Sequence, residues 1–285
     1  MTNTLLNADL HSHSVVSDGT LSPEELALRA KSNGVELWAL TDHDEVGGLE
    51  RAMAAAREQG LPFLTGTEIS VSFVGATVHI VGLGFDHTDA TLLKGLSTTR
   101  SGRAQRAQQM SDELAKAGIP GALEGAMKYV GNPDLISRSH FARYIVEAGH
   151  CPDTNAVFRK YLAEGKPGYV PHQWAKLSEA VGWITGAGGV AVIAHPGRYP
   201  LSANEEFALF TEFKNHGGQG VEVITGSHGR ADFIKYADYC SEFDLVASRG
   251  SDFHSPAESR IDLGQLPDLS GTLTPVWSLL ESRVH

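Results

Sequence analysis

Short apolar runs alternate with amphipathic stretches along most of the chain. The runs predict strands near residues 5, 36, 62, 77, 190, 220 and 245. Between them, apolar residues recur at helical spacing and predict helices over 22–34, 48–59, 178–187, 204–215 and 231–241, with a last helix over 275–282. Strands and helices that alternate in this way indicate repeated βα units and a mainly parallel sheet.

The first predicted helix carries signals at both of its ends. Ser22, followed by Pro23 and Glu25, has the form of a capping box with proline at the first helical position. Gly34 is expected to end the helix, because glycine adopts the left-handed backbone at little cost. These signals support a helix rather than a loop after the first strand.

The alternation of strands and helices breaks near Ser97. From there to Val170 the pattern predicts helices at about 100–118 and 139–148 but no convincing strand. This stretch has ten Lys and Arg residues against seven Asp and Glu, whereas the whole chain has a net charge of −11. We therefore predict an α/β domain formed by residues 1–96 and 171–285, with a basic helical insertion at 97–170 that caps the substrate site.

Composition restricts the setting in which the protein acts. A chain of 285 residues with two distant cysteines, Cys151 and Cys240, indicates a large core and a reducing compartment rather than a disulfide framework. No apolar run approaches the roughly 20 residues of a membrane helix, so a cytoplasmic location is expected. The acidic net charge argues against binding long duplex nucleic acid, although the basic insertion could hold one or two phosphates. The sequence leaves the oligomeric state open.

Metal-binding side chains lie at or just beyond the ends of most predicted strands. Since parallel strands open their carboxyl ends on one face of a sheet or barrel, residues far apart in the sequence can meet there. His11 and His13 would point the same way from an extended segment. The residues expected on this face are His11, His13, Asp18, His43, Glu68, His195, Asp252 and His254, and His79 could join them from within its strand.

Some of these side chains have simpler alternative roles. Asp18 could cap the turn that precedes Gly19, and His79 could be a core histidine bonded to the backbone. Asp42 is expected to orient a ligand rather than bind metal, and Asp9 could do the same for a ligating histidine.

The order of these motifs resembles the PHP (polymerase and histidinol phosphatase) family: His-x-His, Thr-Asp-His, Gly-x-Glu, a strand histidine, Ala-His-Pro and Ser-Asp-x-His. The resemblance implies a distorted seven-stranded βα barrel that holds two or three divalent metals and cleaves phosphoesters. It also implies that nine residues are metal ligands: His11, His13, Asp18, His43, Glu68, His79, His195, Asp252 and His254. Phe253 stands where many members have alanine, at a position that is not a ligand.

The basic insertion resembles one branch of that family. The segments that carry this resemblance are Arg100-Ser101-Gly102-Arg103, Ile136-Ser137-Arg138-Ser139-His140-Phe141 and Ala194-His195-Pro196-Gly197. It implies removal of the 3′-phosphate from nucleoside 3′,5′-bisphosphates such as pAp, or trimming of 5′-phosphorylated short RNA from its 5′ end. The alternatives are a histidinol-phosphate phosphatase and a non-catalytic module in which the metals are structural.

The donor set also indicates how the site works. Six imidazoles and three carboxylates are too many for one ion, which binds about four to six ligands, so two or three ions are expected. Nitrogen and oxygen donors without thiolate favour Mn²⁺, with Fe²⁺ or Zn²⁺ as alternatives. A metal-bridging water would then attack phosphorus. His228, beyond the sixth strand, is a candidate acid for the leaving group, and a surface histidine is the alternative.

A second set of residues is predicted to bind the substrate's phosphate. Ser137 and Ser139 flank Arg138 at a predicted helix start, where backbone N–H groups favour anions. The full set is Arg103, Ser137, Arg138, Ser139 and Arg198, with Arg249 as a weaker candidate. Alternatively, Arg103, Arg106 and Arg138 could form a solvated helix face. The expected partner is a small nucleotide or the 5′ end of a short RNA.

Overall fold

A single sheet of seven strands runs through the chain in sequence order. The computed structural model describes residues 5–285. The strands are β1 (Ala8–Asp9), β2 (Leu37–Leu40), β3 (Phe63–Phe73), β4 (Ala76–Leu83), β5 (Val190–Ile193), β6 (Gly220–Thr225) and β7 (Val246–Gly250). β7 returns to β1, where the backbone N–H of Leu10 donates to the carbonyl of Arg249 at 3.0 Å. The predicted distorted seven-stranded barrel is confirmed, although the first strand begins at Ala8 rather than near residue 5.

One strand of the barrel runs against the others. β1, β2 and β3 pair in parallel, as do β5, β6 and β7, whereas β4 is antiparallel to both of its neighbours. β3 and β4 form a hairpin that turns at Val74 and Gly75, both with positive φ. The prediction that Glu68 follows the end of a strand is therefore wrong, since β3 continues to Phe73 because residues 66–73 pair with β4. Glu68 instead projects from the middle of β3, and His79 projects from within β4, as predicted.

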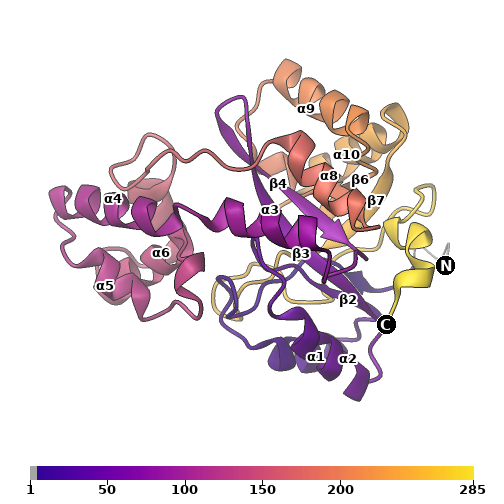
Figure 1. The fold of residues 1–285 in the computed structure, drawn as a ribbon, viewed down its shortest axis with the longest axis horizontal. Coiled ribbons are helices and arrows are strands. Elements are labelled where there is room, and N and C mark those ends of the chain that lie inside the picture. Colours follow the sequence, from indigo (N-terminus) through magenta and orange to yellow (C-terminus); the bar gives the residue numbers. More distant parts are fainter. Residues whose placement is uncertain (1–4) are drawn as a thin grey trace.

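Helices surround the barrel on its outer face (Figure 1). They are α1 (Pro23–Ser32), α2 (Leu49–Glu58), α3 (Ala90–Arg100), α8 (Leu177–Gly186), α9 (Ala203–Asn215) and α10 (Arg230–Glu242). The capping box of α1 is confirmed, because Ser22 N donates to Glu25 Oε2 at 2.7 Å while Ser22 Oγ accepts from Glu25 N. Within residues 5–285, no helix has both the length and the apolar surface needed to cross a bilayer.

One expected helix starts later than predicted, and another is absent from the described chain. The helix expected over 100–118 is present as α4 (Arg103–Lys116), but it starts later than expected, because Gly102, with φ of 91°, separates it from α3. The helix expected over 275–282 is replaced by two 3-10 turns, η4 (Val276–Leu279) and η5 (Glu281–Arg283). The backbone of Leu280, with φ of −119°, interrupts any continuous helix there.

A group of helices projects from the barrel and has its own apolar core (Figure 1). It comprises α4, α5 (Ala122–Met127), η1 (Pro133–Leu135), α6 (Arg138–Glu147), α7 (Thr154–Val157) and a π-helical turn, η2 (Phe158–Leu162). Met110, Phe141 and Leu162 pack together in that core, whereas the barrel residues pack in a different cluster. α3 contacts α8 on the barrel, so the helices from α4 to η2 are those that stand apart.

Candidate metal centre and substrate cleft

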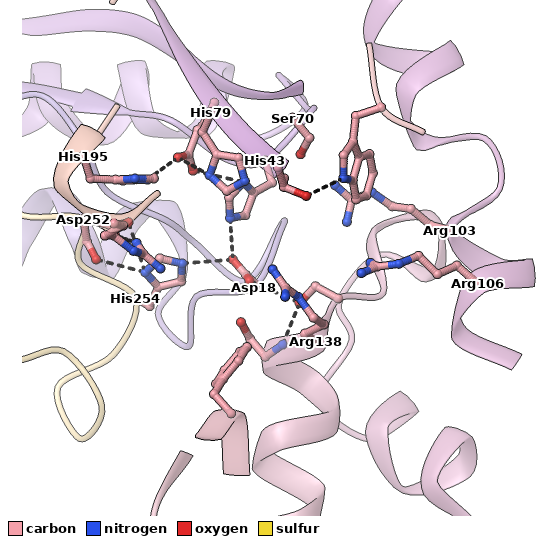
Figure 2. A pocket seen from close by; sticks show the side chains of 17 residues that line it. Asp18, His43, Ser70, His79, Arg103, Arg106, Arg138, His195, Asp252 and His254 are labelled. Carbon is pink, nitrogen blue, oxygen red and sulfur yellow. Dashed lines mark hydrogen bonds and ion pairs between the residues drawn. The ribbon is translucent and has the colours of Figure 1, made fainter. Parts of the chain in front are cut away.

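The nine predicted ligands lie close together, although nearly the whole chain separates the first from the last. Figure 2 labels six of them: Asp18, His43, His79, His195, Asp252 and His254. Eight of the nine form three groups, in each of which one donor atom per residue lies within 4.8 Å of the others. The groups are His13, Asp18, His43 and His254; His11, His13, Glu68 and Asp252; and His43, Glu68 and His79. The ninth, His195, places its Nε2 2.9 Å from Glu68 Oε1.

Glu68 lies at the centre of this cluster. Its carboxylate is fully buried, and Oε2 lies 3.2 Å from His13 Nε2 and 3.0 Å from His43 Nδ1. Oε1 lies 2.7 Å from His79 Nδ1. Although burial would raise the pKa of Glu68, the surrounding imidazoles hold it well below its usual value. Glu68 is therefore an anionic group that can contact more than one cation at once.

Several buried donor atoms in the cluster fit bound cations. Asp18 Oδ1, His43 Nδ1 and Glu68 Oε2 form no hydrogen bond with any residue in the described part of the chain. Burial would lower the pKa of His13, yet Asp252 and Glu68 raise it to about 10, so the carboxylates attract positive charge. A divalent cation would satisfy these atoms and displace such protons. The donor set of imidazoles and carboxylates suits a first-row transition metal.

Glu222 belongs to the centre and was not predicted from the sequence. It projects from β6 with 1% of its surface exposed, and its Oε1 lies 2.6 Å from His11 Nδ1. Its Oε2 accepts the backbone N–H of His195 at 2.6 Å. These contacts fix the His11 ring so that Nε2 faces the cluster. A lone carboxylate between the apolar Val221 and Val223 was the available signal.

Asp42 and Asp9 hold loops rather than imidazole rings. Asp42 Oδ1 accepts from Ser14 N at 2.8 Å and from Ser17 Oγ at 2.6 Å, and it lies outside the three donor groups. Asp9 accepts from the backbone of Ser251 and Gly264, both at 2.8 Å. The expectation that Asp9 could orient a ligating histidine is wrong, because its carboxylate stabilises the loop that follows β7.

The backbone around the centre is strained. Asp44, His195 and Asp252 have φ values of 50°, 27° and 57°, which non-glycine residues rarely adopt. At Gly250 a Cβ would lie 2.3 Å from the Cβ of His11, so only glycine allows β7 to approach the segment after β1 this closely. Tight packing between distant segments thus brings the donor groups together.

Three arginines face the ligand cluster across a cleft. In Figure 2, Arg103 and Arg106 lie on one side of Asp18 and His43. The ligands His195, Asp252 and His254 lie on the other side. Arg103 and Arg106 come from α4, and Arg138 is the first residue of α6. Arg103 pairs with the buried carboxylate of Asp44, its guanidinium lies 4.7 Å from the centre of the Trp174 ring, and its Nε has no hydrogen-bond partner in the described chain.

Arg106 is a buried cation without an acidic partner. Only 8% of its surface is exposed, and its Nε donates to the carbonyl of Val170 at 3.0 Å. No carboxylate in residues 5–285 lies within ion-pair distance of it. Burial, together with Arg138 and Arg103, lowers the pKa of Arg106 to about 10. The alternative of a solvated helix face is therefore wrong for Arg106, which is a buried cation whose charge no carboxylate in residues 5–285 balances.

The other predicted phosphate-binding residues line the same cleft: Arg103, Ser137, Arg138, Ser139 and Arg198. Burial lowers the pKa of Arg138, whose one described hydrogen bond, to Leu162 O, is 3.5 Å long. Arg198 pairs with Asp252, the Nη1–Oδ2 distance being 2.6 Å. Arg106, Phe158 and Trp174 also line the cleft, and these three were not included in the predicted phosphate-binding set.

Two predicted roles do not fit the structure. His228 Nδ1 bonds the carbonyl of Val223 at 3.1 Å and its Nε2 accepts from Gly197 N at 3.1 Å, so neither nitrogen is available as an acid for a leaving group. Arg249 is buried and donates to backbone carbonyls, including that of Pro267 at 2.8 Å, rather than facing the cleft. Both side chains secure loops.

His140 makes the stability of α6 sensitive to acid. Its Nδ1 accepts from Ser137 N at 3.0 Å, and burial lowers its pKa to about 4. Since its pKa is lowered on folding, the stabilisation is present above about pH 6.5 and is lost as the pH falls towards 4. As the pH is lowered below 6.5, the free energy of unfolding of the metal-free protein should fall in wild type and in His140→Asn. We expect the slope against pH to be steeper in wild type by about 1 kcal/mol per pH unit.

Urea unfolding at pH 7, 6 and 5 would measure this difference. His150→Asn is the matched control, because His150 is exposed near the end of the same helix and should leave the wild-type slope unchanged. If the free energy of unfolding had the same slope against pH in wild type and in His140→Asn, the lowered pKa of His140 in the folded protein would be contradicted.

The chain is similar in sequence and in fold to several known proteins. The model of the PHP domain matches residues 9–185. The chain is 51% identical over 280 residues to a 3′,5′-nucleoside bisphosphate phosphatase from Chromobacterium violaceum, covering 98% of each chain. It is 40% identical over 282 residues to the 5′-3′ exoribonuclease Rnm of Escherichia coli, covering 98% of this chain and 96% of that one. The solved structure of an amidohydrolase from Chromobacterium violaceum, with bound sulfate and no metal, superposes with a TM-score of 0.95 at 52% identity and covers 98% and 97% of the two chains.

Proposed function

Because the chain belongs to the PHP domain family and is a phosphoric ester hydrolase, we propose that it removes the 3′-phosphate from nucleoside 3′,5′-bisphosphates. The observation that carries this proposal is the pair of partly or fully buried guanidiniums, Arg106 and Arg138, which face the metal ligands without a carboxylate partner in residues 5–285. A second phosphate on the substrate would supply the missing negative charge. The relative named as a bisphosphate phosphatase supports the same substrate class.

The two phosphates would occupy two different parts of the cleft. The 3′-phosphate would lie at the ligand cluster, and the 5′-phosphate would lie among Arg103, Arg106 and Arg138. Ser139 lines the same cleft, and its hydroxyl can donate to a phosphate oxygen.

The three donor groups would hold two or three divalent cations, with Mn²⁺ as our first choice and Fe²⁺ or Zn²⁺ as alternatives. When bound, these ions supply Lewis-acid polarisation of the phosphate and lower the pKa of water. The chain's own residues bind and orient the reactants. Glu222 fixes the ring of His11, and Arg198 lies beside Asp252, where it can neutralise negative charge on the phosphate.

The predicted insertion at 97–170 would act as a cap over the substrate. It supplies the three arginines, whereas the barrel supplies all nine predicted ligands. Arg143 of α6 connects the two parts, because its guanidinium donates to both carboxylate oxygens of Glu258 at 2.8 Å and to the carbonyl of Asp18 at 2.7 Å. Binding of a bisphosphate would therefore require both parts of the chain.

Histidinol phosphate fits this cleft less well. It carries one phosphate and an ammonium group, and the buried guanidiniums of Arg106 and Arg138 would repel that cation. The relatives at 51% and 40% identity are named for a nucleotide and an RNA substrate. A purely structural role for the metals would not require unpaired arginines beside the ligands.

Phosphate release with added Mn²⁺ tests the proposal. Substrates would be pAp, the 3′-monophosphate and 5′-monophosphate of adenosine, and histidinol phosphate. We expect kcat/KM for pAp to exceed that for the 3′-monophosphate by about 100-fold, since charge-assisted hydrogen bonds contribute about 1.5–3 kcal/mol each. Preference for histidinol phosphate would overturn the proposed substrate.

A further inference from the structure

Asp18 lies in a turn between β1 and α1 rather than in a strand of the barrel. Its carboxylate is buried, and Oδ1 lies 3.7 Å from His43 Nε2 and 3.3 Å from His254 Nε2 (Figure 2). No hydrogen bond within residues 5–285 reaches this oxygen. Since no strand pairing fixes the turn, the position of Asp18 Oδ1 beside the two imidazoles depends on the contacts that hold the turn.

Two side chains of the insertion hold that turn. Arg143 is buried, and its Nη2 donates to the carbonyl of Asp18 at 2.7 Å. Ser137, which caps α6, donates its hydroxyl to Asp18 Oδ2 at 3.2 Å. Within residues 5–285, the hydrogen bonds from the insertion to the nine predicted ligands all end on Asp18. The insertion thus holds the backbone and one carboxylate oxygen of this ligand and leaves Oδ1 facing the imidazoles.

Arg143 also holds the loop that carries His254. Its Nε and Nη2 donate to the two carboxylate oxygens of Glu258, both at 2.8 Å. Glu258 follows His254 in a short loop that closes on itself, because His254 N donates to Ser259 Oγ at 2.8 Å. One guanidinium therefore joins the two loops whose ligands, Asp18 and His254, approach each other to 3.3 Å.

We propose that Arg143 is a positioning residue for one cation site, the group formed by His13, Asp18, His43 and His254. This inference rests on the proposed function, in which the donor groups hold cations. Ligands on loops that are already joined lose less conformational freedom when a cation binds.

The other two donor groups should not depend on Arg143. They contain neither Asp18 nor His254, and none of their residues bonds Arg143 within the described chain. A role limited to attaching the insertion to the barrel would instead affect all the donor groups alike or none of them. A positioning role therefore predicts that loss of Arg143 weakens one cation site and spares the others.

Equilibrium binding of Mn²⁺ to the metal-free protein tests the inference, with the unbound ion measured from the electron paramagnetic resonance signal of aqueous Mn²⁺. In Arg143→Met, one class of site should bind Mn²⁺ about 10- to 100-fold more weakly, the usual effect of removing a group that orients a metal ligand, and the remaining sites should change by less than about threefold. Arg143→Lys retains a cation that can donate to the carbonyl of Asp18, so it should lose affinity at the same site but to a smaller extent.

Arg29→Met is the matched control. Arg29 of α1 donates to both carboxylate oxygens of Asp262, at 2.7 and 2.6 Å, and so joins a helix to the segment after β7 without bonding a predicted ligand. The Mn²⁺ affinities of this variant should equal those of wild type. Urea unfolding of the metal-free variants checks that each one folds. If Arg143→Met does not fold, Arg143→Lys carries the test, since the same single site should weaken in it.

The possible outcomes separate this inference from the proposed function. Unchanged Mn²⁺ binding in the Arg143 variants, an equal loss at every site, or the same selective loss in Arg29→Met would overturn the positioning role and leave the proposed function intact. A wild type that binds no Mn²⁺ would overturn the proposed metal centre itself.

Discussion

Glu68→Gln is expected to lower kcat for a nucleoside 3′,5′-bisphosphate by about 1,000-fold or more and to reduce the number of metal ions bound per chain. Glutamine has nearly the same size and shape but no negative charge. Glu68 is the carboxylate that approaches His13, His43 and His79 at once. Its loss should therefore weaken more than one cation site, and a loss of about 4 kcal/mol of transition-state stabilisation corresponds to about 1,000-fold in rate.

Metal content by elemental analysis and phosphate release under saturating Mn²⁺ measure the two effects. Glu206→Gln is the matched control, because Glu206 is also a buried carboxylate but bonds Tyr236 at 2.8 Å on the outer helices, away from the cleft. It should keep the wild-type metal content and kcat. Full metal content together with full activity in Glu68→Gln would contradict the central position assigned to this residue.

The barrel could be predicted because its signals are local. Most strands are short apolar runs followed by a turn signal. The mainly parallel topology then places residues as distant as His13 and His254 together, with ring centres 4.1 Å apart. β3 was predicted too short because Gly66 looks like a strand end, whereas its pairing with β4 is a tertiary contact that a local pattern does not contain.

The environment of the site was harder to predict than its donors. Glu222 has no motif around it, and its function depends on lying opposite His11 across the barrel. Arg106 looks like one charge among several on a basic helix, and only the packing of α4 against the segment near Val170 shows that it is buried. His228 follows the sixth strand, where site residues are expected, yet backbone groups bond both of its ring nitrogens. Burial and partner choice are tertiary properties, so residue type and spacing do not determine them.

Arg106→Met is expected to lower kcat/KM for a nucleoside 3′,5′-bisphosphate by about 100-fold, since a hydrogen bond to a charged group contributes about 1.5–3 kcal/mol. The kcat/KM for the 3′-monophosphate, which has no 5′-phosphate, should change by less than about threefold. Methionine retains most of the apolar length of the side chain and removes the charge. No carboxylate in residues 5–285 lies within ion-pair distance of that charge. The free energy of unfolding should therefore change by no more than about 1 kcal/mol, because removal of an uncompensated buried cation offsets the lost hydrogen bond to Val170.

The combination of results distinguishes substrate binding from a structural role. Arg159→Met, at an exposed position of the same insertion, should leave both activities and the stability unchanged. Inorganic phosphate should raise the thermal midpoint of wild type more than that of Arg106→Met, because a ligand that binds the folded state more tightly stabilises it more at the same concentration. If Arg106→Met instead lost stability and lost activity equally on both substrates, Arg106 would be a packing residue, and the unpaired charge that supports a bisphosphate substrate would have to come from Arg138 alone.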